Sequence, residues 1–302
     1  MLLLKVNRPV NKLASYLFPK WKFKMGNNVL LPIPAEFIIA MELLDAAPDF
    51  PWSGNGGRSD YILAESIYMK NHYLEQGIKE EKIILTGALY NDIFTLVSKE
   101  REKFYNMFCL KYKVSRIKPM VLISLPQYLS NFIDRALEFN SYNDFLNYFI
   151  GCLVKIKGDF NIVLSVHPRM YKENIIEFIH PDIILSDERL EQLIPMCKFY
   201  INCESSTTRW AIACAKPVIN YDFYRLNYKI FSVNEGVVTI NTTLDFEKTL
   251  NKFCYNYKYY ESLKQVQDKL RPEYGLLDGR VEDRMLNFFK SIAPNCGWSK
   301  RP

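Results

Sequence analysis

The chain has 302 residues, of which 49% are hydrophobic, and a formal net charge of +6. This length allows two domains, and the apolar content can fill a core in each. With 12 Gly and 15 Pro, the composition excludes collagen-like, low-complexity and largely disordered chains. No apolar stretch reaches the roughly 20 residues that cross a bilayer, and the start is too interrupted for a signal peptide. We therefore expect a cytoplasmic protein.

Cysteine and histidine usage argues against a metal centre. The seven Cys are odd in number, never form a CxxC pair, and in several cases stand inside apolar runs, where Cys behaves as a small hydrophobe. The three His show no metal-binding spacing. These patterns predict a reducing compartment, no metal site and no resident cofactor.

Residues 1–24 are strongly basic. They contain six Lys or Arg and no Asp or Glu, interleaved with apolar residues such as Leu17 and Trp21. Such a segment can rest on an anionic membrane surface. A basic, solvated face over a buried apolar one is the simpler interpretation. We expect no nucleic-acid partner, because the basic residues form no long stripe and no nucleic-acid motif accompanies them.

The first half of the chain shows few regular elements before residue 60. Residues 25–58 are turn-rich, with one predicted helix at 35–44. Beyond them the pattern predicts strands at 61–66 and 82–87 and helices at 67–76 and 91–108. Basic, turn-prone residues 111–119 then predict a domain boundary.

The second half alternates regularly. Strands are predicted at 120–125, 161–166, 182–185, 199–203, 217–221 and 237–240, with helices at 141–157, 171–179, 187–196, 207–215, 244–256, 259–270 and 281–291. This alternation is typical of a doubly wound α/β domain with a parallel sheet. We divide the chain into an abbreviated N-terminal Rossmann-like domain, 1–115, a C-terminal Rossmann-like domain, 116–275, and a C-terminal helix and tail, 276–302.

Two buried strands end abruptly in polar residues. The apolar run 162–166 breaks at His167, Pro168 and Arg169, and the run 199–203 breaks at Glu204, Ser205, Ser206, Thr207 and Thr208 before a small-residue helix. Open α/β sheets bind ligands at the carboxyl ends of their strands. We therefore expect both breaks, on strands taken as neighbours, to face one site.

The second break has phosphate-binding chemistry. A helix N-terminus offers free N–H groups and partial positive charge, and Ser or Thr hydroxyls can donate to phosphate oxygens. N-capping of the helix is the alternative role, although four hydroxyls in a row exceed what a cap requires. Glu204 would repel a phosphate, so we expect it to turn away or to bind a sugar or ribose hydroxyl.

Other residues complete the predicted site. His167 and Arg169 could donate to the same anion and stabilise a nucleotide leaving group. A strand-end histidine and a surface arginine are the alternative roles. Tyr221, at the end of the following strand, is expected to reach the crevice together with Asp222. No residue is identified as the catalytic base.

These stretches resemble GT-B nucleotide-sugar transferases of bacterial surface polysaccharide assembly. Residues 59–94 resemble the end of a GT-B first domain, and HPR at 167–169 and ESSTT at 204–208 resemble the His-Pro and Ser-Ser/Thr motifs of bacterial sialyltransferases and capsular Kdo transferases. The resemblance implies a GT-B-like fold, two Rossmann-type domains with parallel sheets, the first abbreviated. It also implies transfer from a nucleotide-sugar, in particular a CMP-sugar, to a glycan or lipid-linked glycan, without metal, at the inner face of the membrane.

The sequence departs from that family where the base should lie. Only 59 residues precede Asp60, and they lack the acidic triplet that supplies the base in sialyltransferase-like families. Enzymes similar to UDP-N-acetylglucosamine 2-epimerases or to CDP-glycerol glycerophosphotransferases are therefore alternatives, although the epimerases would have a Ser-Gly-Gly turn. A non-catalytic relative that binds a nucleotide or a partner protein is a further alternative.

Overall fold

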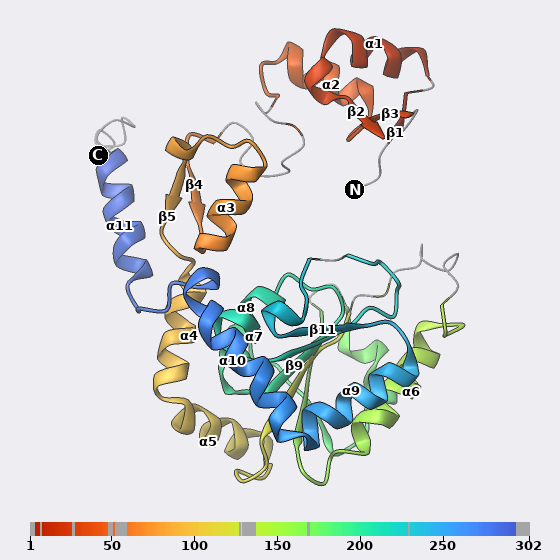
Figure 1. Cartoon of the computed structure of the whole chain (residues 1–302), viewed down its shortest axis with the longest axis vertical. Helices are drawn as coiled ribbons and strands as arrows, with labels where there is room; N and C mark the ends of the chain where they lie inside the picture. The colour runs from red at the N-terminus through yellow and green to blue at the C-terminus, as the bar shows by residue number, and fades with distance from the viewer. Residues whose placement is uncertain are drawn as a thin grey trace. The chain divides into compact units, whose positions relative to one another are not determined.

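The computed structural model describes residues 4–6, 8–25, 28–47, 51, 59–126, 128, 137–167, 170–228 and 230–293. The chain forms two compact units, Met1–Gly87 and Ala88–Pro302, which we call the N-terminal and C-terminal units (Figure 1). The sequence placed the division later, at residues 115–116. Each unit is described by itself below.

The N-terminal unit contains two small sheets. The first is antiparallel, in the order β1-β3-β2, and accompanies helices α1 and α2, while the second consists of parallel strands β4 and β5 joined by α3. Their bounds are β1 Leu4–Lys5, α1 Pro9–Leu17, β2 Phe23–Met25, β3 Asn28–Leu31, α2 Ala35–Leu43, β4 Ile62–Ala64, α3 Ile67–Glu75 and β5 Ile83–Leu85. The elements predicted beyond residue 34 are confirmed, whereas the antiparallel sheet was not predicted.

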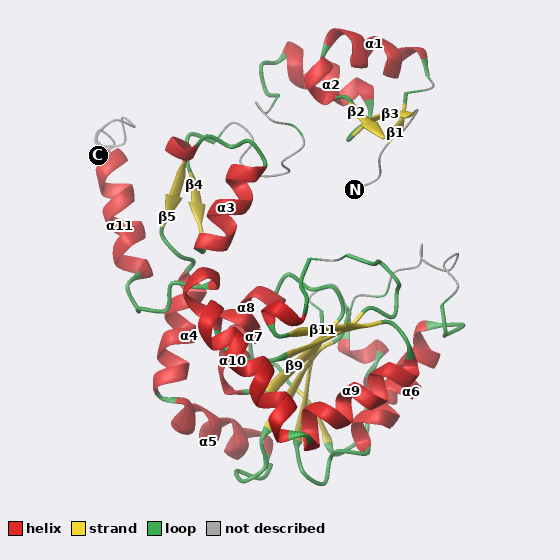
Figure 2. Ribbon diagram, in the orientation of Figure 1, coloured by secondary structure: helices red, strands yellow, loops and turns green. Residues whose placement is uncertain are grey.

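The C-terminal unit is built on six parallel strands in the order β11-β10-β9-β6-β7-β8 (Figure 2). They are β6 Met120–Ser124, β7 Asn161–Ser165, β8 Ile183–Leu185, β9 Phe199–Asn202, β10 Val218–Tyr221 and β11 Val237–Ile240. The chain builds β6, β7 and β8 outward in one direction and then returns to β6 to build β9, β10 and β11 in the other. The order reverses between β6 and β9, where Ile123 lies beside Ile201. This doubly wound parallel sheet confirms the predicted fold class.

Helices cover both faces of this sheet. They are α4 Leu89–Lys99, α5 Arg101–Tyr112, α6 Tyr142–Val154, α7 Leu190–Met196, α8 Thr208–Ala213, α9 Thr243–Tyr255, α10 Tyr257–Tyr274 and α11 Val281–Ile292. Phe145 of α6 and Phe246 of α9 join alternate strand residues such as Ile201 in one buried cluster. On the opposite face α7 packs against α4, and α8 packs against α10. The inner strands β6, β7, β9 and β10 are therefore buried on both sides, which explains the near-continuous apolar runs in the sequence, whereas the edge strand β11 exposes Thr239.

Three features differ from the sequence predictions. The predicted helix at 91–108 is two helices that meet at Glu100, and the break lets Phe94 and Phe108 both face the core. The predicted helix at 171–179 is two 3-10 turns, Lys172–Asn174 and Ile176–Phe178. The adjacent β-branched Ile175 and Ile176 weaken an α-helix there. Helices α4 and α5 belong to the C-terminal unit because they bond to it, as Arg101 Nη2 does to Met196 O at 2.7 Å.

Candidate functional site

The predicted site residues that the structure describes stand at the carboxyl edge of the six-stranded sheet. All six strands are parallel, so their carboxyl ends meet at this edge. The order of the strands reverses between β6 and β9, and ligands of open α/β sheets bind at such switch points. The loop of Glu204 to Thr207, which we call the β9–α8 loop, leaves β9 at this point.

The hydroxyls of this loop are mostly bonded within the protein. Thr207 Oγ1 lies 2.8 Å from the Tyr200 hydroxyl and 2.7 Å from Ser205 Oγ. Thr208 Oγ1 accepts from Asn202 Nδ2 at 2.9 Å. Thr207 occupies the N-cap position of α8, yet its side chain forms no capping hydrogen bond. These hydroxyls therefore fix the loop to β9 rather than cap the helix.

Ser206 differs from its neighbours. Its side chain is exposed, and within the described part of the chain its hydroxyl has no hydrogen-bond partner. The backbone N–H groups of Ser205 and Ser206 likewise donate to no described group. The loop thus presents two backbone donors and one hydroxyl in succession.

Glu204 is held in an unusual conformation. Its φ of 44° lies in the left-handed region, which non-glycine residues rarely adopt. The side-chain amide of Asn220 forms two hydrogen bonds with Glu204: its Oδ1 accepts from Glu204 N at 2.8 Å, and its Nδ2 donates to Glu204 Oε1 at 2.7 Å. Burial raises the pKa of the Glu204 carboxyl, the hydrogen bond from Asn220 opposes that rise, and nearby Asp222 adds to it. The carboxylate therefore turns toward β10.

His167 lies farther from this loop than the sequence predicted. It is half-buried just beyond β7, and its carbonyl accepts from Met170 N at 2.8 Å. Strands β7 and β9 are not neighbours, because β6 pairs with both. The two breaks are thus separated by two strand spacings, about 10 Å. Pro168 and Arg169 lie outside the described residues.

Tyr221 and Asp222 are buried rather than presented at the edge. The Tyr221 side chain is 1% exposed, and its ring stacks on Phe246 with centroids 4.7 Å apart. Asp222 is equally buried, and its two carboxylate oxygens accept from the backbone N–H groups of Leu226 and Asn227 at 2.8 and 2.7 Å. The Tyr221 ring is committed to packing and the Asp222 carboxylate to loop support. That these two side chains reach a ligand-binding crevice stays a prediction.

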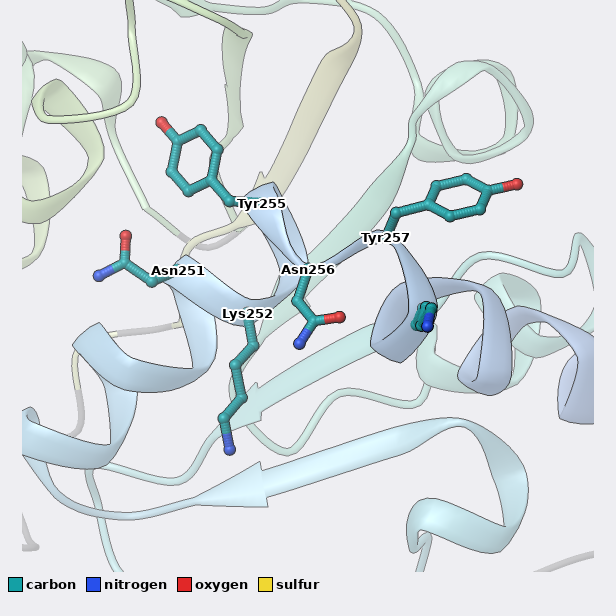
Figure 3. Close-up of a pocket in the computed structure, with 6 residues that line it drawn as sticks. Asn251, Lys252, Tyr255, Asn256 and Tyr257 are labelled. Atoms are coloured by element: carbon teal, nitrogen blue, oxygen red, sulfur yellow. The ribbon is translucent and has the colours of Figure 1, made fainter.

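One small cavity lies at this edge of the sheet, and a larger hollow lies at the opposite edge. A cavity of about 10 Å³ at the switch point is lined by residues of β6, β9, β10 and α6, including Ser124 and Tyr221, and by residues that follow the strands, such as Cys203. A shallow hollow of about 550 Å³ lies at the junction of α9 and α10 (Figure 3). Tyr255, which lines the hollow, donates to Asp159 ahead of β7, so the hollow is at the amino edge of the sheet. None of the predicted site residues lines the hollow.

The structure adds three polar residues that sequence reasoning missed. Tyr200, Asn202 and Asn220 are all buried, and each bonds to the β9–α8 loop or to the start of α8. A signal was present, since Asn202 ends β9 and Asn220 stands next to the last residue of β10, in strands that are otherwise mostly apolar. In the part of the chain that is described, no group of three or more His, Cys, Asp or Glu could hold a metal ion.

Solved structures with a similar architecture are known. The wall teichoic acid polymerase TagF aligns with a TM-score of 0.58 at 12% identity, over 80% of this chain and 59% of that one. The UDP-GlcNAc 2-epimerase from Neisseria meningitidis, bound to UDP-GlcNAc, aligns with a TM-score of 0.52 at 15% identity, over 80% of this chain and 68% of that one. The chain has a GT-B-like fold.

MnaA from S. aureus, solved with UDP, aligns with a TM-score of 0.51 at 16% identity, over 80% of this chain and 63% of that one. The GT-B-like chain thus spans about three fifths of the length of TagF and of MnaA. At these identities the likeness concerns the fold. No protein-family model and no curated protein matches the sequence.

Proposed function

We propose that this GT-B-like chain transfers a sugar or polyol phosphate from a cytidine nucleotide to a glycan or lipid-linked acceptor in surface polysaccharide assembly. The observation that carries the proposal is the set of unused donors at Ser205 and Ser206, beside the switch point of the sheet. Successive backbone N–H groups after a left-handed residue form a concavity that suits phosphate oxygens. The site would therefore hold the phosphate of an activated donor.

Two independent likenesses support the proposal of a cytidine base. The motif resemblance favours a CMP-sugar donor, and the TagF structures include one soaked with CDPG, which aligns over 82% of this chain and 60% of that one. Both donors carry a cytidine nucleotide. A UDP-linked donor, as in the epimerase structures, is the competing alternative.

Each side chain then has a role. Glu204 Oε2 has no hydrogen-bond partner among the described residues and would accept from a ribose hydroxyl. His167, two strands away, would contact the transferred group rather than the same phosphate oxygen, with Pro168 and Arg169 in the same segment. Thr207 and Thr208 hold the loop in place. The catalytic base is not assigned.

Calorimetric titration with CMP, CDP and UDP tests the proposal. We expect the cytidine nucleotides to bind at least tenfold more tightly than UDP. Ser206→Ala removes one hydrogen bond to a charged acceptor, about 1.5–3 kcal/mol, and should weaken CMP binding about tenfold or more. Ser262→Ala, which removes an exposed hydroxyl that bonds to Tyr259 O on α10, is the matched control and should leave binding unchanged.

Other outcomes of the titration contradict the proposal in different ways. Absence of binding to any of the three nucleotides would overturn the transferase hypothesis altogether. Tighter binding of UDP would favour the epimerase-like alternative. Binding without turnover of any activated donor would favour a non-catalytic relative. His167 would contact the transferred group, so its role is tested with an activated donor: unchanged affinity of His167→Ala for a CMP-sugar or for CDP-glycerol would remove His167 from the site.

We also propose that the N-terminal unit contacts an anionic membrane on the cytoplasmic side. Helix α1 buries Ala14 but exposes Leu13, Tyr16 and Leu17 by 50%, 82% and 52%. Exposed Arg8 and Lys12 flank this apolar face. Basic residues around an exposed apolar face suit an anionic interface. Of the helices that the structure describes, none is long and apolar enough to cross a membrane.

Binding to vesicles of anionic phospholipid tests this contact. Leu13→Ser with Leu17→Ser should reduce binding severalfold, and added salt should reduce it further. The matched control is Met107→Ser with Leu110→Ser, which removes two exposed apolar side chains from α5. Equal binding by both double variants would contradict the contact.

A further inference from the structure

Asn220 is a buried polar residue in β10, and its neighbours in the sheet register, Asn202 of β9 and Thr239 of β11, are polar too. It lies in β10 between Ile219 and Tyr221, and its side chain is 6% exposed. Its Nδ2 donates to Glu204 Oε1 at 2.7 Å and to Thr239 Oγ1 of β11 at 3.2 Å, while its Oδ1 accepts from Glu204 N at 2.8 Å. Because the backbone N–H can only donate, the orientation of the amide is determined.

Two hydrogen bonds with Asn220 restrain both the backbone and the side chain of Glu204. Asn220 Oδ1 accepts from the Glu204 backbone N–H, and Asn220 Nδ2 donates to the Glu204 carboxylate, so the carboxylate is held against β10. A left-handed conformation is unfavourable for a glutamate and persists only where its surroundings enforce it. Asn220 is the group that enforces it. A loop that needed only a turn would have a Gly or Asn at position 204 instead.

The hydrogen bonds with Asn220 determine the position of Oε2, the second carboxylate oxygen of Glu204. Oε1 is occupied by Asn220, which leaves Oε2 as the acceptor one residue ahead of the unused N–H groups of Ser205 and Ser206. In a nucleotide the ribose is the group bonded directly to the phosphate. A phosphate at Ser205 and Ser206 would thus place the ribose next to Glu204.

We propose that Asn220 is a positioning residue that gives the site its preference for ribonucleotides. It holds the Glu204 carboxylate in the one orientation that accepts a hydrogen bond from a ribose 2′-hydroxyl. This inference rests on the proposed nucleotide-binding function. Removal of the amide donor frees the carboxylate and abolishes the preference, while the phosphate donors of the loop stay in place.

The ratio of the dissociation constants for CMP and 2′-deoxy-CMP tests the inference. The protein should bind CMP about tenfold more tightly than the deoxynucleotide, as expected for one hydrogen bond to a carboxylate. Asn220→Asp keeps the acceptor for Glu204 N but loses the donor to Oε1. We expect this ratio to fall toward one, with the affinity for 2′-deoxy-CMP kept within about threefold.

Asn256→Asp is the matched control, because it makes the same chemical change at an exposed position where Asn256 caps α10. It should leave the ratio at its original value. Glu204→Gln should lower the ratio independently, which guards against poor folding of the Asn220 variant. A merely structural role would weaken binding of both nucleotides equally, so an unchanged ratio in Asn220→Asp overturns the inference. Failure of the unaltered protein to bind either nucleotide would instead overturn the proposed function.

Discussion

Removal of the Tyr221 hydroxyl should stabilise the protein. This side chain is 1% exposed, and its hydroxyl is a buried polar group without a hydrogen-bond partner among the described residues. Tyr221→Phe deletes that one oxygen and keeps the ring stacked on Phe246. A phenol that is bonded to nothing gains no stability from its oxygen, whereas its burial still removes that oxygen from water.

The size of the effect follows from the surroundings of the hydroxyl. A buried polar group without a partner costs about 1–3 kcal/mol. The cavity beside Tyr221 is about 10 Å³, at the lower limit of what one water molecule needs, so a bridging water relieves little of this cost. We expect Tyr221→Phe to gain about 1 kcal/mol, which raises the Tm by about 2–4 °C for a unit of this size.

Tyr200 provides the matched comparison on the neighbouring strand. It is also fully buried, but its hydroxyl bonds to Thr207 Oγ1 at 2.8 Å. Tyr200→Phe should therefore lose about 1 kcal/mol. Differential scanning calorimetry of both variants, with CMP titration, measures the contrast. A lower Tm in Tyr221→Phe, or a loss of CMP affinity, would show that the hydroxyl has a partner or a ligand and would refute the reasoning.

Three further predictions concern buried or capping carboxylates. Asp222→Ala removes a buried carboxylate that accepts from two partly buried N–H groups, those of Leu226 and Asn227, and should cost about 2–3 kcal/mol in urea denaturation. Asp92→Ala removes the carboxylate that accepts from Val281 N and Glu282 N at the start of α11, and amide hydrogen exchange should quicken across that helix. The pKa of Glu204 is raised in the folded state, so the folded protein binds more protons and stability falls as pH rises through that pKa. Glu204→Gln should remove this fall, and a pH-stability profile identical to the unaltered protein would contradict it.

The sheet of the C-terminal unit was predictable because its inner strands are buried on both faces. Runs such as 162–166 and 199–203 are mostly apolar, with one polar residue each, and each stands between clear helical patterns. The antiparallel sheet of the N-terminal unit has no such signal. Its strands are two to four residues long, and tertiary pairing rather than local pattern defines them.

The sequence was sufficient to predict which loop forms the candidate site, but not how the residues of the site are arranged in space. The run of Glu204 and four hydroxyl residues after a strand was visible, but strand order is not a local property. His167 was therefore placed one strand too close, since nothing in the sequence shows that β6 separates β7 from β9. The grip of Asn220 on Glu204 was hidden for the same reason, because it joins residues of adjacent strands.

The residues after β9 contain hydroxyls that bond within the protein and donors that are left for a ligand, and the sequence does not distinguish the two. The hydroxyls of Thr207 and Thr208 form hydrogen bonds with Tyr200 and Asn202. The backbone N–H groups of Ser205 and Ser206 remain as unused donors. Every residue except proline has the same backbone N–H group, whatever its side chain. A phosphate site made of backbone N–H groups therefore requires a particular loop conformation more than particular side chains. The left-handed backbone conformation of Glu204, which the hydrogen bond to Asn220 holds in place, determines that loop conformation. The residues that define this site are therefore the buried polar ones beneath the loop as much as the exposed Ser206.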